Sequence, residues 1–256
     1  MNVTLNTKSH NMYATQNFRA AQSTTIQAYR SFSNELTNIV NKKHSLNINK
    51  YYGRFYELAR AFNKEDGIRE FTKLSRSLME FLVSKDCDNM AGIICSILIR
   101  FNKETNNSKN VEDLALRGIA IARRSNDVVH IAARANDMNV VLRQKEPGSD
   151  RHIKYLKVQN QALEDLCRDY NKDVVKKCST NSKELAPLEN YEGSLCYVKL
   201  DIATYDLLKE PGYAKSELEK AKKIYARIRN FYPPDIAEVI DKRIESLEQK
   251  YKLCGF

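Results

Sequence analysis

The chain contains few of the residues that make tight turns. It has only 8 glycines and 5 prolines in 256 residues, and it has no tryptophan. Sandwiches, barrels and nucleotide-binding α/β folds need many tight turns, so this composition argues against all three classes. The sequence also lacks an apolar run of 18 residues, and a membrane-spanning helix is therefore not expected.

The motifs of common enzyme classes are missing as well. There is no P-loop, no GxGxxG, no GxSxG and no HExxH. The six cysteines form no CxxC pair, so we expect neither a zinc site nor another metal or cofactor. His130 and His152 flank one predicted helix pair and are interpreted as packing or surface residues rather than general bases. The sequence predicts a non-enzymatic protein, and an enzyme of unknown class is the residual alternative.

The net charge is +10, and the excess is unevenly placed. Residues 1–50 hold six basic residues and one acidic residue, Glu35, whereas the rest of the chain is only mildly basic. Residues 1–25 contain no acid and are rich in Asn, Thr, Ser and Gln. This segment predicts a disordered polar tail over residues 1–20, and a targeting or secretion signal within 1–25 is the alternative. Because the cysteines favour a reducing compartment, the expected location is cytoplasmic, with export left open.

Apolar residues follow a helical period from about residue 50 onward. The pattern predicts a helical domain over 50–253, preceded by an N-terminal helix and linker over 21–49, and about eight to nine helices in all. The polar stretch 171–187 is interpreted as a long loop, and 104–110 as a polar linker. Every proline falls between predicted helices. This placement is expected, because proline has no backbone N–H to donate and its ring clashes with the preceding turn inside a helix. The predicted fold class is all-α.

The predicted helix–turn–helix units resemble one another. Phe81, Ala122 and Ala162 occupy similar positions and are 41 and 40 residues apart. Small residues at a helix crossing let two helices pack closely, and each pair then leaves an apolar face that the next pair covers. The pattern therefore indicates a repeat of helix pairs, and an irregular helical bundle is the alternative.

The stretch YDLLKEPGYAKSELEKAKKIY carries an aromatic residue, Tyr205, followed by Ala214, Leu218 and Ala221. This small–large–small pattern after an aromatic resembles the tetratricopeptide (TPR) repeat, and the resemblance covers roughly residues 65–252. It implies a right-handed α-solenoid of antiparallel helix pairs. The period is nearer 40 than the family's 34 residues, and Asn139 stands where the family has a glycine.

In such a solenoid the first helix of each pair lines a concave groove. The resemblance implies that the predicted helix 128–144 places Asn136, Val140 and Arg143 toward the groove, and that the helix 188–208 contributes Lys199. Asparagine and arginine at such positions can bind a peptide's backbone or a carboxylate. The alternative is that these are ordinary solvated residues.

Two basic clusters form a second candidate surface. They consist of Arg117, Arg123 and Arg124 on one helix, and of Lys222, Lys223 and Arg227 on another. Such clusters can contact the phosphates of RNA or DNA. Glu217 and Glu219 interleave with the second cluster, so a charged, solvated face is the other interpretation.

The leading hypothesis is a protein–protein interaction module or scaffold whose groove binds a peptide or a partner helix. It rests on fold-level analogy. The alternatives are an RNA- or DNA-binding helical protein that uses its basic faces, and an exported effector with an N-terminal secretion signal.

Overall fold

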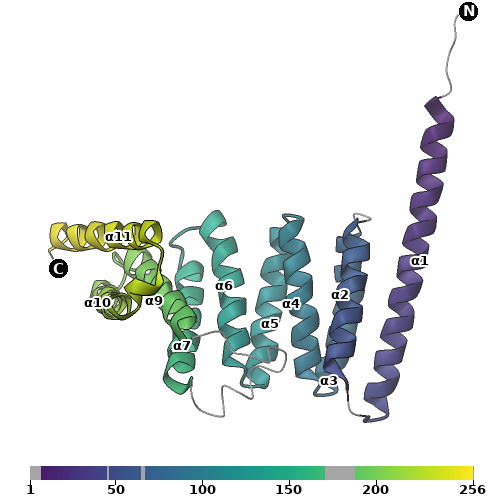
Figure 1. Cartoon of the computed structure of the whole chain (residues 1–256), viewed down its shortest axis with the longest axis horizontal. Coiled ribbons are helices and arrows are strands. Elements are labelled where there is room, and N and C mark those ends of the chain that lie inside the picture. The colour runs from purple at the N-terminus through teal and green to yellow at the C-terminus, as the bar shows by residue number, and fades with distance from the viewer. Residues whose placement is uncertain (1–6, 45, 65–66, 171–187, 256) are drawn as a thin grey trace, which may run out of the picture. The chain divides into compact units, whose positions relative to one another are not determined.

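The structure is a computed structural model that describes residues 7–44, 46–64, 67–170 and 188–255, with the backbone alone for residues 7–23 and 64. Within these ranges every regular element is helical, which confirms the all-α prediction, and there are ten α-helices in place of the predicted eight to nine (Figure 1). The elements are α1 (Thr7–Asn41), α2 (Ile48–Lys64), α3 (Ile68–Ser84), α4 (Asp88–Glu104), α5 (Ser108–Arg124), α6 (Val128–Lys145), α7 (Asp150–Asp169), α9 (Leu188–Tyr205), α10 (Pro211–Ile228), the short 3-10 helix η1 (Arg229–Phe231) and α11 (Pro234–Leu253).

Three element boundaries differ from the sequence predictions. Helix α1 begins at Thr7, inside the segment predicted as a disordered tail. The predicted linker 104–110 is only a short turn, because α4 continues to Glu104 and α5 begins at Ser108. The predicted loop 171–187 and residues 1–6 of the predicted tail lie outside the described residues, and the secretion signal stays a prediction.

The same turn ends three consecutive helices. Asp86, Asn106 and Asn126 have positive φ angles of 56°, 53° and 53° and lie 20 residues apart. After each of them, the next backbone N–H donates to a carbonyl five residues earlier, as from Cys87 to Leu82 at 2.9 Å. This is the Schellman arrangement, which pairs the last carbonyls of a helix. Helices of 17 residues joined by such turns account for the 40-residue spacing of the sequence pattern.

Replacing Asn106 tests this turn, because the residue is exposed and has a φ of 53°. A β-branched residue in this left-handed region is strained, so Asn106→Val should lower the free energy of unfolding by about 1–2 kcal/mol. Asn106→Gly should leave it unchanged or raise it. Urea unfolding measures both variants. Thr105→Val is the control, since φ is −97° there, and equal loss in the two valine variants would contradict the assignment.

The chain divides into two units, Met1–Asn110 and Val111–Phe256, whereas the sequence pattern predicts one helical domain over residues 50–253. In the first unit, α1 packs on α2 and α3, and α4 packs on α2 and α3. Aromatic rings fill the centre, and Phe71 contacts Phe55 and Phe62 with centroid separations of 4.9 and 4.8 Å. Tyr29 and Phe32 bring α1 to this cluster. The first unit is therefore built around a cluster of aromatic rings from α1, α2 and α3.

One carboxylate ties α1 to α2. Glu35 accepts hydrogen bonds from Arg54 Nη1 at 2.6 Å, from Tyr51 Oη at 2.8 Å and from Lys50 Nζ at 3.3 Å. These donors stabilise the ionised carboxylate, with Arg54 as the largest contributor, and lower the pKa of Glu35 from 4.5 to about 2. The ion pair therefore stabilises the folded state at pH values where Glu35 is charged.

Glu35→Gln tests this contact through its pH dependence. Because the folded pKa lies below the ordinary value, the contribution is complete above about pH 4.5 and is lost as the pH falls toward 2. The difference in melting temperature between the native chain and this variant should therefore shrink between pH 6 and pH 3. Glu57→Gln is the control, because Glu57 pairs with Arg60 inside α2. If the difference in melting temperature between the native chain and Glu35→Gln does not change with pH, the ion pair does not account for it.

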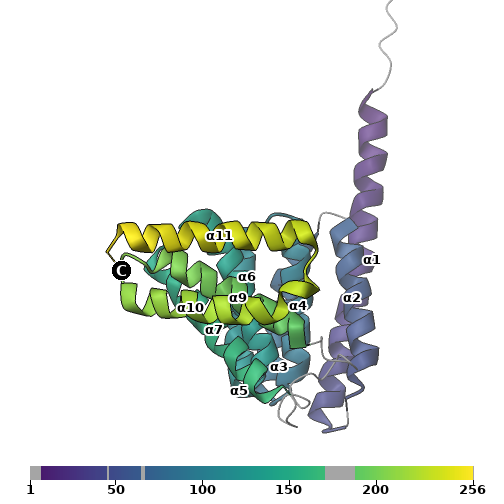
Figure 2. The same ribbon diagram turned by 60° about the vertical axis from the view of Figure 1, so that its left-hand side comes forward.

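In the second unit each described helix from α6 onward packs on the next. Helix α6 lies on α7, α7 on α9 and α9 on α10, and α11 contacts both α9 and α10 (Figure 2). Small residues allow close approach, and Ala203, Ala214 and Ala221 are fully buried. Tyr205, the aromatic of the sequence pattern, packs against the His152 ring with centroids 4.9 Å apart. Tyr205, Ala214 and Ala221 of the TPR-like stretch therefore pack in the core of the second unit.

The apolar stripe of α11 is buried over only part of its length. Ile240, Ile244, Leu247 and Tyr251 on α11 belong to the core of the second unit. Val239, in contrast, is 61% exposed. The Tyr251 hydroxyl donates to the carbonyl of Ala203 at 3.0 Å, which fixes the end of α11 on α9. Helix α11 is thereby held in place against α9.

Candidate functional site

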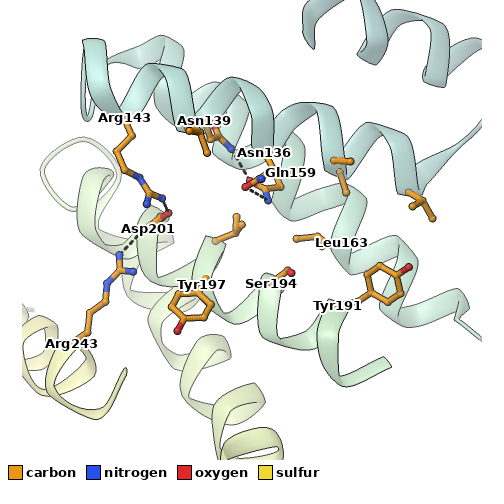
Figure 3. A pocket seen from close by; sticks show the side chains of 15 residues that line it. Asn136, Asn139, Arg143, Gln159, Leu163, Tyr191, Ser194, Tyr197, Asp201 and Arg243 are labelled. Carbon is orange, nitrogen blue, oxygen red and sulfur yellow. Dashed lines mark hydrogen bonds and ion pairs between the residues drawn. The ribbon is translucent and has the colours of Figure 1, made fainter. Parts of the chain in front are cut away.

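A groove of about 460 Å³ opens between α6, α7, α9 and α11 in the second unit (Figure 3). Its size lies within the range of small-ligand sites. The α6 wall carries side chains spaced three or four residues apart, which share one face of a helix. The residues of this wall are Val129, Ala132, Ala133, Asn136, Asn139, Val140 and Arg143.

Helix α6 is held at its start by its own N-terminal residues. Asp127 accepts a hydrogen bond from the His130 backbone N–H at 3.0 Å, which caps the helix. The same carboxylate lies 2.6 Å from His130 Nδ1. His130 therefore has a local structural role, in agreement with its interpretation as a packing or surface residue.

A chain of side-chain amides runs across the groove from α6 to α7. Asn139 Nδ2 donates to Gln159 Oε1 at 2.8 Å, and Gln159 Nε2 donates to Asn136 Oδ1 at 3.3 Å. Asn139 is only 2% exposed, yet its Oδ1 has no hydrogen-bond partner. An unpaired buried acceptor is unfavourable unless a donor reaches it. The amide chain thus leaves one buried acceptor unsatisfied beneath the groove.

One end of the groove is charged. Asp201 on α9 accepts hydrogen bonds from two arginines: Arg143 on α6 reaches Oδ2, and Arg243 on α11 reaches Oδ1 at 2.6 Å. Arg243 also donates to Thr204 Oγ1 at 3.1 Å. The Asp201 side chain is only 8% exposed, whereas that of Arg143 is 51% exposed. Figure 3 shows the two guanidinium groups converging on this carboxylate from different helices.

Tyrosines line the α9 side of the groove. Tyr191, Ser194 and Tyr197 follow one another at intervals of three residues along α9, and Tyr197 is 36% exposed. The Tyr197 ring meets the edge of Tyr232 with centroids 6.5 Å apart. A Cβ at Gly193 would lie 2.5 Å from the Tyr232 hydroxyl. Glycine at this position therefore allows Tyr232 to pack behind the tyrosine wall.

Three of the four residues predicted for the groove line it. Asn136, Val140 and Arg143 lie on the α6 wall, and Val140 is 41% exposed. The prediction for Lys199 is wrong, because Lys199 is 1% exposed and points away from the groove between α7 and α10. The error is one of helical register, since the groove face of α9 passes through Val198 and Asp201.

Lys199 instead forms the centre of a buried ionic cluster. Its Nζ donates to Glu217 at 2.5 Å, to Glu164 at 2.5 Å and to Asn160 at 2.9 Å. Burial raises the pKa of Glu217, but hydrogen bonds from Lys199 and Lys220 outweigh burial and hold the pKa below its ordinary value. The cluster therefore joins α7, α9 and α10 through ion pairs and a hydrogen bond that all involve Lys199.

Sequence reasoning missed several groove residues. The sequence pattern does not predict Gln159, Asp201 or Arg243 as site residues, although each lines the groove. Asp201 had a recognisable signal, because it lies in the largely apolar stretch LCYVKLDIA, where a charged side chain needs a partner. Arg243 had no comparable signal in the polar sequence of α11.

The basic-face candidates lie on two different helices. Arg117, Arg123 and Arg124 are exposed on α5, and Lys223 is exposed on α10. Lys222 pairs with Glu219 at 3.1 Å and with Glu248 at 2.6 Å. Arg227 pairs with Glu192 at 2.7 Å. The charge of the α10 cluster is therefore partly neutralised, which weakens the case for a phosphate-binding face.

The other candidate chemistries can be tested against the described residues alone. Among these residues no group of three or more His, Cys, Asp or Glu side chains is placed to hold a metal ion. No helix in this part of the chain is long and apolar enough to cross a membrane.

His152 is fully buried, burial lowers its pKa, and its Nδ1 accepts the Gly148 N–H at 3.1 Å. His152 thus fixes the turn before α7.

Comparisons of the chain with protein-family models, with curated proteins and with solved structures find no match in any of the three. The geometry of the groove is therefore the basis for the functional proposal.

Lys199→Met tests the buried cluster. The variant leaves the fully buried Glu217 without its central cation, and the free energy of unfolding should fall by about 3–5 kcal/mol in urea unfolding. Adding Glu217→Gln should recover part of this loss. Lys222→Met is the control, since exposed pairs contribute about 1 kcal/mol or less. Equal losses for the two lysine variants would contradict the cluster's role.

Proposed function

We propose that the second unit is a non-enzymatic protein-interaction module whose groove binds an extended peptide segment of another protein. The observation that carries the proposal is the combination of Val140, which is half-exposed, and Asn136, which is exposed, on one wall of the groove. Val140 offers apolar area, and the Asn136 amide offers hydrogen-bonding groups to a peptide backbone. An extended peptide supplies both kinds of complementary group at regular spacing.

A TPR-like architecture is part of this proposal. It is supported by three 17-residue helices that are followed by equivalent turns, and by small residues at the helix contacts of the second unit. A right-handed α-solenoid of such pairs would present preformed helices to the peptide. Preformed walls reduce the ordering cost of binding, because little of that cost falls on the receptor.

The nucleic-acid alternative has weaker support. Lys222 and Arg227 engage Glu248 and Glu192, so phosphate binding would have to compete with existing ion pairs. The groove contains tyrosine rings that can stack on bases, but its centre is an apolar and amide surface rather than a row of cations. A peptide can contact the tyrosine rings, the apolar surface and the amides, whereas stacked bases use the tyrosine rings alone.

The test is selection of random twelve-residue peptides, displayed on phage, against the immobilised full chain. Peptides that bind the groove should lose at least tenfold in affinity to Val140→Asn, because this variant replaces exposed apolar area with a hydrated amide. Val239→Asn is the matched control, since Val239 is an exposed valine of α11 outside the groove. The proposal fails if no peptide is enriched, or if the enriched peptides bind both variants and the native chain equally.

A further inference from the structure

A buried histidine closes the turn between α6 and α7. His152 lies in the first turn of α7 and is fully buried. Its Nδ1 accepts the backbone N–H of Gly148 at 3.1 Å. Because an amide N–H can only donate, Nδ1 must be the unprotonated nitrogen, and the neutral ring carries its proton on Nε2. The hydrogen bond therefore exists only while His152 is neutral.

The closed turn has no place for a second proton on this ring. An imidazolium donates from both nitrogens, so protonation would set an N–H of His152 against the N–H of Gly148. The other nitrogen, Nε2, is buried and has no hydrogen-bond partner within the described part of the chain. A buried cation whose donors lack acceptors is strongly unfavourable. Protonated His152 is therefore incompatible with the closed turn.

The end of α9 covers the other side of the turn. The Tyr205 and His152 rings pack with centroids 4.9 Å apart. Gly148 has a φ of 75°, and a Cβ there would lie 3.3 Å from Tyr205 Cδ1, so glycine permits this close approach. Lys209 donates to the Gly148 carbonyl at 3.0 Å and to Asp150 at 2.6 Å. The Lys209 contacts are exposed and contribute little, which makes the bond to His152 the buried tie of the turn.

Charges from α6 and α9 act on the imidazole. Burial is the largest effect and lowers the pKa of His152 below 6.5. Asp201 on α9 and Glu146, at the end of α6, raise this pKa, whereas Arg143 on α6 lowers it. The Asp201 carboxylate is already shared by Arg143 and Arg243, so it is a weak counter-ion for His152. The neutral imidazole is therefore favoured in the closed turn.

Acid shifts the balance toward an open turn. A solvated His152 has its ordinary pKa of 6.5, and the closed form has a lower one. The open form therefore binds more protons as the pH falls below 6.5. The closed turn is fully stable above about pH 6.5 and loses stability with falling pH, by at most about tenfold in the closing equilibrium for each pH unit, because one proton is involved.

We propose that the α6–α7 turn is an acid-sensitive latch, which the hydrogen bond between Gly148 and His152 holds closed and which opens when His152 takes up a proton. The latch follows the end of α6, where Val140 and Arg143 line the groove. Opening would release this end of α6, so the shape of the groove wall would depend on pH. The inference does not depend on the proposed peptide-binding function, because opening can be measured without a ligand.

Hydrogen–deuterium exchange of the full chain between pH 7.5 and pH 5 measures the latch. Mass spectrometry follows peptides that cover residues 146–152, and each exchange rate is divided by the intrinsic rate at that pH. Protection of the turn should fall by up to about tenfold for each pH unit below 6.5 and should recover on return to pH 7.5. Helix α10, which lies in the same unit and contains no histidine, should keep its protection.

Non-titrating variants separate the latch from a general effect of acid. The side-chain oxygen of asparagine can take the place of Nδ1 and accept the Gly148 N–H at every pH, so His152→Asn should not show the fall in protection. His152→Gln also removes the titrating group and should likewise show no fall. His130→Asn is the matched control, because His130 lies at the start of α6 beside Asp127. This control should keep the pH dependence of the native chain.

Three results would overturn the latch. The first is protection of residues 146–152 that stays constant down to pH 5, and the second is an equal fall in the native chain and in both His152 variants. The third is an equal loss of protection in α10, because the whole unit would then unfold rather than the turn alone. None of these results concerns the peptides that depend on Val140, so the latch and the proposed function can fail separately.

Discussion

Asp201 is the contact on which the geometry of the groove depends. Its carboxylate lies on α9 and accepts hydrogen bonds from Arg143 on α6 and from Arg243 on α11, so three walls of the groove meet at one side chain. A nearly buried carboxylate is unfavourable unless its oxygens are paired. Each oxygen has its own guanidinium here, and this requirement fixes the distance between helices that are far apart in sequence.

Two polar centres of the second unit differ in whether their hydrogen bonds are satisfied. The Lys199 Nζ donates to Glu217, Glu164 and Asn160, so the three N–H donors of this ammonium group are satisfied within the protein. The amide chain of the groove ends in an unpaired oxygen of Asn139. Buried polar groups that satisfy one another stabilise and orient helices. The Lys199 cluster is therefore structural, whereas the amides of Asn136 and Gln159 line the groove.

The regular spacing of the helices has a local origin. Asp86, Asn106 and Asn126 each adopt a positive φ and end a helix in the same way. Asparagine and aspartate tolerate this region better than other residues with a side chain, so the chain turns without glycine. The low glycine content, which argues against β and nucleotide-binding folds, is therefore compatible with frequent sharp turns between helices.

By itself, the sequence determined most of the helices, because the 3.6-residue period and the prolines located them. Three- and four-residue steps put Asn136, Val140 and Arg143 on one face of α6, but only the resemblance to the TPR repeat assigned that face to a groove. The sequence did not determine the register of α9, where Lys199 was expected in the groove, nor the N-terminal extent of α1. Only the tertiary structure decided that Lys199 is buried and that Asp201 receives Arg243 from α11. These contacts join residues of different helices, and their energies depend on packing distances that local periodicity does not specify.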